Sequence, residues 1–137
     1  MRYTLFERRK DELILVARIL LMILFLIFGW SKLTSFSGTV GFMASEGAPL
    51  PAVSAIIAIV MEFFVGIAIV IGFYTLPLAL IFAVYTLGTA LIGHHFWTMT
   101  GDAYMANMIN FYKNISVMGG LLLLCVTGPG RYSIDRK

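Results

Sequence analysis

Charged residues and cysteine are both scarce in this chain, and each shortage excludes a class of protein. Only 12% of the 137 residues are charged, whereas 60% are hydrophobic. A soluble domain of this length exposes far more polar surface than such a composition supplies. The composition therefore indicates a membrane protein, and we expect one domain over residues 1–137.

The single cysteine, Cys125, lies in the last apolar run. One thiol cannot form a disulfide within the chain, so an internal thiol–disulfide relay is excluded. The sequence also lacks motifs for haem, iron–sulfur, flavin or nicotinamide binding. We therefore expect no covalent cofactor, and the chain could not carry electrons alone.

Lysine and arginine are missing from two connecting segments, 34–50 and 98–107. They gather instead at the two ends of the chain: Arg2, Arg8, Arg9 and Lys10, then Arg131, Arg136 and Lys137. Because basic flanks stay on the cytoplasmic side, both termini are predicted to be cytoplasmic and both segments to lie outside. Because these basic residues are split between two ends that flank membrane spans, they give no support for nucleic-acid binding.

Four apolar runs are each long enough to cross about 30 Å of hydrocarbon as a helix. They occupy residues 13–33, 51–73, 76–97 and 108–127. The first is too long for the apolar region of a signal peptide, so we expect it to be retained. The pattern predicts an all-α membrane protein, an antiparallel four-helix bundle with a tight turn near Gly72 and Pro77.

The first outer segment carries a helical pattern of its own. Phe36, Val40 and Met43 recur at helical spacing, and Gly47 and Pro49 supply a stop signal. We predict a short helix at the outer interface.

Glu62 lies at the centre of the second run, where no other side chain is ionisable. A carboxylate at this depth costs about 2.5–3.5 kcal/mol to insert, so it needs a structural partner or a function. At about 1.5 Å per residue, Lys113 and Arg18 lie closest in depth and are the predicted partners. Lys32 is placed nearer the outer interface, where its stem can reach water.

Most polar side chains of the runs fall in the outer half, above Glu62. If they form a pocket, it opens outward or sideways into the outer leaflet, with Glu62 as its floor. No catalytic residue is assigned. The candidates for ligand binding or proton transfer are Glu62, Lys113, His94, His95, Lys32, Arg18, Asn110, Asn114 and Tyr85.

The adjacent histidines His94 and His95 end the third run. Consecutive residues on a helix point about 100° apart, so both side chains cannot easily hold one metal ion. We therefore expect no metal site. Interfacial anchoring, or a hydrogen bond to a head group or a quinone carbonyl, remains open for each ring.

Several segments together resemble the DoxX family, in particular its small inner-membrane members from enteric bacteria. The matching segments are VARILLMILFLIFGWSK, FSGTVGFMASEGAPLP, MEFFVGIAIVIGF, YTLGTALIGHHFWTMTGDA, NMINFYKN and the ending TGPGRYSIDR. The resemblance implies a four-helix inner-membrane bundle. It also implies a membrane subunit that touches quinone or a partner redox enzyme, which is an analogy at the level of the fold.

Three functions follow from these observations. The first is a quinone-associated subunit of an oxidoreductase, at most non-catalytic or quinone-binding. There Lys113 or a histidine donates to the quinone and Glu62 handles the proton, between walls from Phe25, Phe63, Tyr85 and Phe111. The second is a structural or assembly protein held by a buried ion network. The third is a transporter of protons or small solutes. Besides membrane lipid, the partners considered are a quinone, a redox protein and further copies of the chain.

Overall fold

The computed structural model describes residues 5–136 as helices joined by short links, without a strand in that range. Four helical stretches are long and apolar enough to span a membrane, which confirms the predicted fold class. The helical elements are η1 (Glu7–Arg9), α1 (Lys10–Thr34), α2 (Phe36–Ser45), α3 (Pro51–Ile59), η2 (Val60–Val65), α4 (Gly66–Ile71), α5 (Thr75–Gly93), η3 (Phe96–Thr98) and α6 (Gly101–Thr127).

The spans match the apolar runs closely, with two clear differences. The third run predicted a helix to residue 97 that includes His94 and His95, whereas α5 ends at Gly93 and leaves both histidines outside it. The other difference is at the start of α6. The fourth run predicted a helix from residue 108, whereas α6 begins at Gly101. The seven added residues are mostly polar or small, so they extend the helix without extending its apolar stretch. The short helix predicted in the first outer segment is present as α2.

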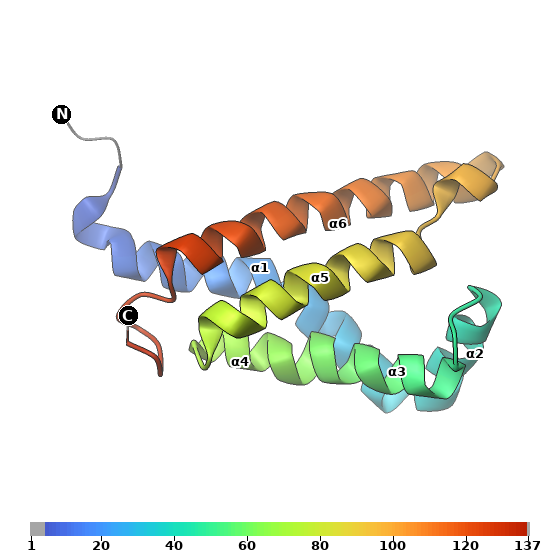
Figure 1. Cartoon of the computed structure of the whole chain (residues 1–137), viewed down its shortest axis with the longest axis horizontal. Coiled ribbons are helices and arrows are strands. Elements are labelled where there is room, and N and C mark those ends of the chain that lie inside the picture. Colours follow the sequence, from blue (N-terminus) through green and yellow to red (C-terminus); the bar gives the residue numbers. More distant parts are fainter. Residues whose placement is uncertain (1–4, 137) are drawn as a thin grey trace.

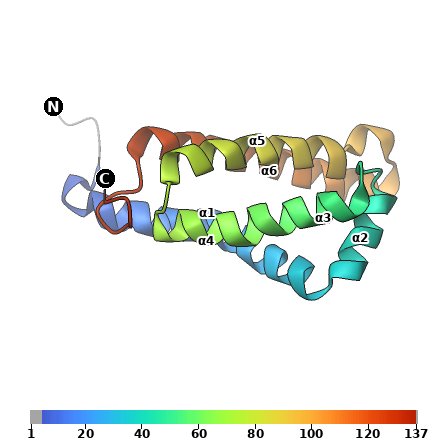
Figure 2. The same ribbon diagram turned by 60° about the horizontal axis from the view of Figure 1, so that its bottom comes forward.

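The spans form two antiparallel hairpins (Figure 1). In one hairpin α1 packs along α4 and η2, and in the other α5 packs along nearly the whole of α6. Both termini lie at one end of the molecule, and α2 lies at the other (Figures 1 and 2). We call these the termini end and the α2 end. Arg2 and Lys137, two of the basic residues behind the predicted orientation, lie outside the described residues.

The buried core joins the two hairpins. Met22 and Phe25 of α1 meet Phe82 of α5, and the Phe25 and Phe82 rings pack edge to face with centroids 4.8 Å apart. Ile69 and Leu121 complete the same cluster from α4 and α6. The outward faces are also apolar and more than half exposed, which fits contact with lipid: Leu20, Ile27, Val84 and Val126.

Residues 128–136, the C-terminal segment, fold back across the termini end of the bundle (Figure 2). Ile134 and Asp135 donate backbone hydrogen bonds to the carbonyls of Ile71 and Gly72, at 3.0 and 2.9 Å. Gly72 has a φ of 74°, and a Cβ there would lie 2.2 Å from the Cβ of Ser133. The turn between α4 and α5 therefore needs glycine both for its conformation and for this contact.

Candidate functional site

A cavity of about 730 Å³ lies between the two hairpins, toward the α2 end. Among the described residues, α3 contacts α1, α2 and η2 but neither α5 nor α6, so the hairpins separate there. Side chains of α1, α2, the α3–η2 span, α5 and α6 all line the space. Of the nine candidate residues, seven line it: Lys32, Glu62, Tyr85, His94, Asn110, Lys113 and Asn114.

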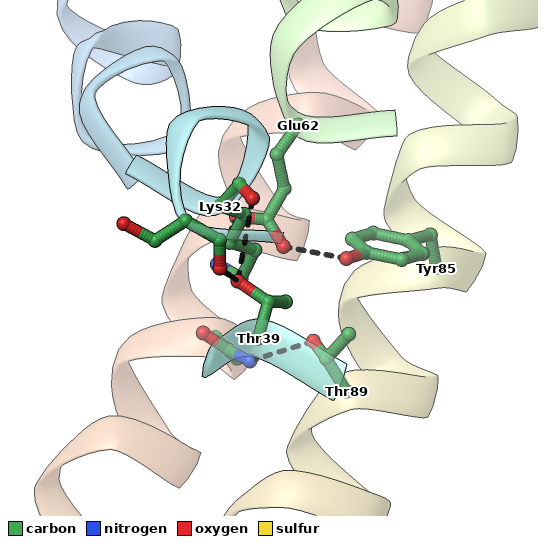
Figure 3. A network of polar contacts seen from close by, with 7 residues as sticks. Lys32, Thr39, Glu62, Tyr85 and Thr89 are labelled. Carbon is green, nitrogen blue, oxygen red and sulfur yellow. Dashed lines mark hydrogen bonds and ion pairs between the residues drawn. The ribbon is translucent and has the colours of Figure 1, made fainter. Parts of the chain in front are cut away.

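The carboxylate of Glu62 is held from two sides at the boundary of this cavity (Figure 3). The ammonium nitrogen of Lys32 lies 2.7 Å from Oε1, and the hydroxyl of Tyr85 donates to Oε2 at 2.6 Å. The Glu62 side chain is only 9% exposed and that of Lys32 23%. The opposite charge of Lys32 and the hydrogen bond from Tyr85 together offset the cost of burying the Glu62 carboxylate.

The partner of Glu62 is thus Lys32, and the prediction of Lys113 or Arg18 is wrong. The reason is the register between α1 and η2. A Cβ on Gly29 would lie 2.8 Å from the backbone nitrogen of Phe63, so Gly29 stands level with Glu62. Lys32 is one turn farther along α1, and helical side chains lean toward the N-terminus of their helix, which brings its ammonium back to that level.

Glu62 also stands in a short π-helical stretch, which the apolar run did not predict. The six residues of η2 interrupt the α-helical pattern, and the backbone N–H of Gly66 donates to the carbonyl of Met61, five residues earlier. Short π segments within α-helices occur often at functional sites. This one places Glu62 opposite both Lys32 and Tyr85.

The α6 wall of the cavity presents Asn110, Lys113 and Asn114. The amide of Asn114 donates to the Thr89 hydroxyl at 3.1 Å, and that of Asn110 donates to the Ala106 carbonyl at 2.9 Å. Within residues 5–136, Lys113 has no hydrogen bond or ion pair, although it lies close enough to Glu62 and Lys32 for their charges to act on its ammonium group. Its ammonium is therefore the cation that this wall can offer to a ligand.

The two histidines differ in their surroundings. His94 lines the cavity, and its Nδ1 lies 3.0 Å from Oδ1 of Asn107. Because the Asn107 amide nitrogen donates to the Ala103 carbonyl, its oxygen is the acceptor and Nδ1 carries the proton. In the neutral ring Nε2 is then an acceptor. His95 instead turns Nδ1 to the Ile92 carbonyl at 2.7 Å and is not among the lining residues.

Arg18 lies far from this site, fully buried at the termini end. Its guanidinium donates to the carbonyls of Ile69 and Val70, at 3.3 and 2.5 Å, and to that of Tyr132. Arg18 therefore binds the carbonyl end of α4 and the C-terminal segment together. This is a structural role, outside the cavity.

The apolar part of the lining differs in part from the prediction. Phe25 and Tyr85 contribute, whereas Phe63 stacks near Trp30 and Phe111 joins an aromatic cluster with Phe96. Sequence reasoning missed the side chains that α2 and the link after it supply: Phe42, Met43, Glu46, Ala48 and Pro49. The helical spacing of Phe36, Val40 and Met43 was the one signal that this segment has an inward face.

Comparison with known proteins places the chain among small inner-membrane proteins. It is 56% identical to the inner membrane protein YphA of Escherichia coli over all of this chain and 98% of that protein. Identity to the inner membrane protein YqjF of the same organism is 44%, over 95% of each chain. The ER-derived vesicles protein ERV29 of Saccharomyces cerevisiae is 26% identical over 96% of this chain and 35% of its own length.

No solved structure matches the chain. The profile of the DoxX family matches residues 13–95, which include most of α1, the π-helical stretch with Glu62, and α5. With four spans and close relatives in the inner membrane, the chain is an integral inner-membrane protein and belongs to the DoxX family.

Proposed function

We propose that this protein binds a quinone in the cavity at the α2 end and presents it to a redox partner protein in the membrane. One observation carries the proposal. Lys113, a cation without an ion-pair partner in residues 5–136, lines a largely apolar space together with the ring of His94. This space lies beside the Glu62–Lys32 pair, whose charges neutralise each other. Ligand sites have this character, with apolar walls and a few polar groups that fix orientation.

The chemistry of the lining suits a quinone head group. Lys113 has three N–H donors and can bind a carbonyl oxygen, while Nε2 of neutral His94 can accept from the hydroxyl of the reduced form. Phe25 and Phe28 offer rings beside these groups. The oxidised and reduced forms thus each find a partner. In this proposal Glu62 holds Lys32 and Tyr85 in place, and proton exchange falls to His94.

In this proposal the protein has one orientation in the membrane. Arg8, Arg9 and Lys10 at the start of α1, with Arg131 and Arg136 after α6, favour a cytoplasmic termini end. The cavity then lies in the outer half of the bilayer. The separation of α3 from α5 and α6 offers a sideways entry, by which a lipid-soluble quinone reaches the site without crossing water.

Thermal unfolding of the purified protein with a short-chain ubiquinone tests this proposal. We expect the unfolding temperature to rise with quinone concentration, because a ligand that binds only the folded state stabilises it. Lys113→Met should raise the apparent Kd about tenfold or more, since a hydrogen bond to a charged group contributes about 1.5–3 kcal/mol. Lys10→Met, outside the cavity, is the matched control and should leave the Kd unchanged. A wild-type protein without any shift contradicts quinone binding.

A second function has its own supporting observation. Both oxygens of Glu62 already accept a hydrogen bond from the protein, and the network joins α1, η2 and α5. A purely structural or assembly protein needs no more than this. In that case quinone leaves the unfolding temperature of the wild type unchanged, while Lys32→Met still lowers the stability strongly.

A further inference from the structure

A second cavity of about 750 Å³ lies at the termini end, between α1 and α6. We call it the inner groove. From α1 it is lined by one continuous helical face: Lys10, Leu13, Ile14, Ala17, Arg18 and Leu21. From α6 the matching face is Gly120, Leu123, Leu124 and Thr127. Neither the Glu62 network nor the cavity at the α2 end uses any of these side chains.

The inner groove exists because α1 and α6 touch only weakly, far less than α1 touches α4 or α5 touches α6. The helices come together at one point, where a Cβ on Gly120 would lie 3.1 Å from a terminal carbon of Leu21. From Leu21 to Lys10 the α1 face runs for about 16 Å at 1.5 Å per residue. The groove therefore follows α1 over this length and ends where Gly120 meets Leu21.

Charge marks the shallow end of the groove. Arg8, Arg9 and Lys10 follow one another at the start of α1, and Lys10 lines the groove itself. Two carboxylates near this end are engaged: Asp11 accepts from the backbone N–H of Arg131, and Glu12 lies 3.8 Å from Arg9. Glu7 also lines this end of the groove, and its backbone carbonyl accepts from the Lys10 N–H. Within residues 5–136 the groups that can hold an anion here are the side chains of Arg8 and Lys10.

We infer that the inner groove binds an anionic phospholipid, with one acyl chain against α1 and α6 and the phosphate at Arg8 and Lys10. An acyl chain suits this groove, because its walls are mainly apolar and it ends where α1 and α6 meet at Leu21. Basic pockets between membrane helices on the cytoplasmic side bind anionic head groups by the same chemistry.

Native mass spectrometry of the purified protein, titrated with phosphatidylglycerol or with phosphatidylcholine, tests this inference. We expect the wild type to retain phosphatidylglycerol preferentially. The double variant R8Q/K10Q should bind it about 30-fold more weakly, since each basic residue near a membrane surface contributes about 1 kcal/mol. The matched control R131Q/R136Q removes the same charge from the same end of the molecule and should keep the preference.

The position of the acyl chain is tested separately by Ala17→Phe, which places a ring in the groove while the head-group residues remain. This variant should lose most of the retained lipid. Equal loss in R131Q/R136Q and R8Q/K10Q would mean unspecific attraction and overturn the inference. So would equal retention of phosphatidylcholine, or full binding by the Ala17→Phe protein. A dimer that Ala17→Phe dissociates would identify the groove as an interface between two copies instead.

Discussion

At the scale of single residues, Glu62 is a carboxylate in the middle of a membrane span, and each of its two oxygens has a partner. Its side chain is nearly buried, and two helices other than its own supply a cation and a hydroxyl to it. A carboxylate in that setting is tolerated only while both partners remain, because the hydrocarbon offers no replacement for a lost donor. Lys32 and Tyr85 are thus as necessary to the local structure as Glu62 itself.

We expect Lys32→Met to lower the free energy of unfolding by about 3 kcal/mol, because it leaves the Glu62 carboxylate without its counter-charge. Chemical denaturation in detergent micelles measures this loss. The double variant K32M/E62Q should recover part of it, since a neutral amide no longer needs a cation. Lys113→Met is the control for removing a lysine from the cavity wall and should change the stability by about 1 kcal/mol or less.

A second residue-scale prediction concerns Gly29, which lets α1 approach the backbone of η2. A Cβ there would lie 2.8 Å from the nitrogen of Phe63 and 3.0 Å from the carbonyl carbon of Glu62. Gly29→Ala should therefore cost about 1–3 kcal/mol through overpacking. At Gly119 a Cβ meets open space, so Gly119→Ala should instead stabilise α6 by about 1 kcal/mol. Thermal unfolding of the two variants should show shifts of opposite sign.

At the scale of elements, the C-terminal segment joins parts of the chain that are distant in sequence. The Asp135 carboxylate accepts hydrogen bonds from the backbone N–H groups of Tyr74 and Thr75, at 3.0 and 2.8 Å. It thereby caps the start of α5, whose own preceding residue supplies no side-chain cap. Together with Arg18, it fastens the end of the chain to the turn between α4 and α5.

We expect Asp135→Ala to destabilise the protein by about 1–2 kcal/mol, the usual cost of removing an N-cap. Asp135→Asn should cost less than Asp135→Ala, because its single amide oxygen can still accept one of the two hydrogen bonds, although the second bond and the favourable charge at the helix start are lost. Hydrogen exchange followed by mass spectrometry can localise the effect. Faster exchange confined to residues 72–78 supports the capping role, whereas unchanged exchange there with a global loss contradicts it.

The helices also show which structural features could be predicted from the sequence alone. Hydrophobic runs predicted the four spans, because the bilayer demands length and apolarity from each span by itself. The helical spacing of Phe36, Val40 and Met43 predicted α2. The pairing of Glu62 depended on how α1 and η2 are aligned, and a glycine contact sets that alignment. The π-helical stretch and the fold-back of residues 128–136 likewise result from tertiary contacts. The polar residues that line the cavity at the α2 end were predicted as a group, but their individual partners were not.

At the scale of the whole molecule, the two hairpins are tied at one end and separate at the other. Arg18 and Asp135 close the termini end, the core around Phe82 joins the hairpins farther along, and the polar cavity occupies the α2 end. A bundle of this shape places its ionisable lining in one half of the bilayer. The side of the membrane that this half faces therefore decides which compartment can exchange protons or ligands with it.

Labelling of single cysteines decides that side. In a Cys125→Ala background, Ser45→Cys at the end of α2 and Thr98→Cys at the end of η3 are both exposed, as is Arg136→Cys in the C-terminal segment. If the basic ends are cytoplasmic, a membrane-impermeant maleimide added to spheroplasts should modify positions 45 and 98 at once. Position 136 should react only after the membrane is permeabilised. The opposite pattern would turn the cavity toward the cytoplasm, and the quinone site would then have to exchange its protons with that compartment.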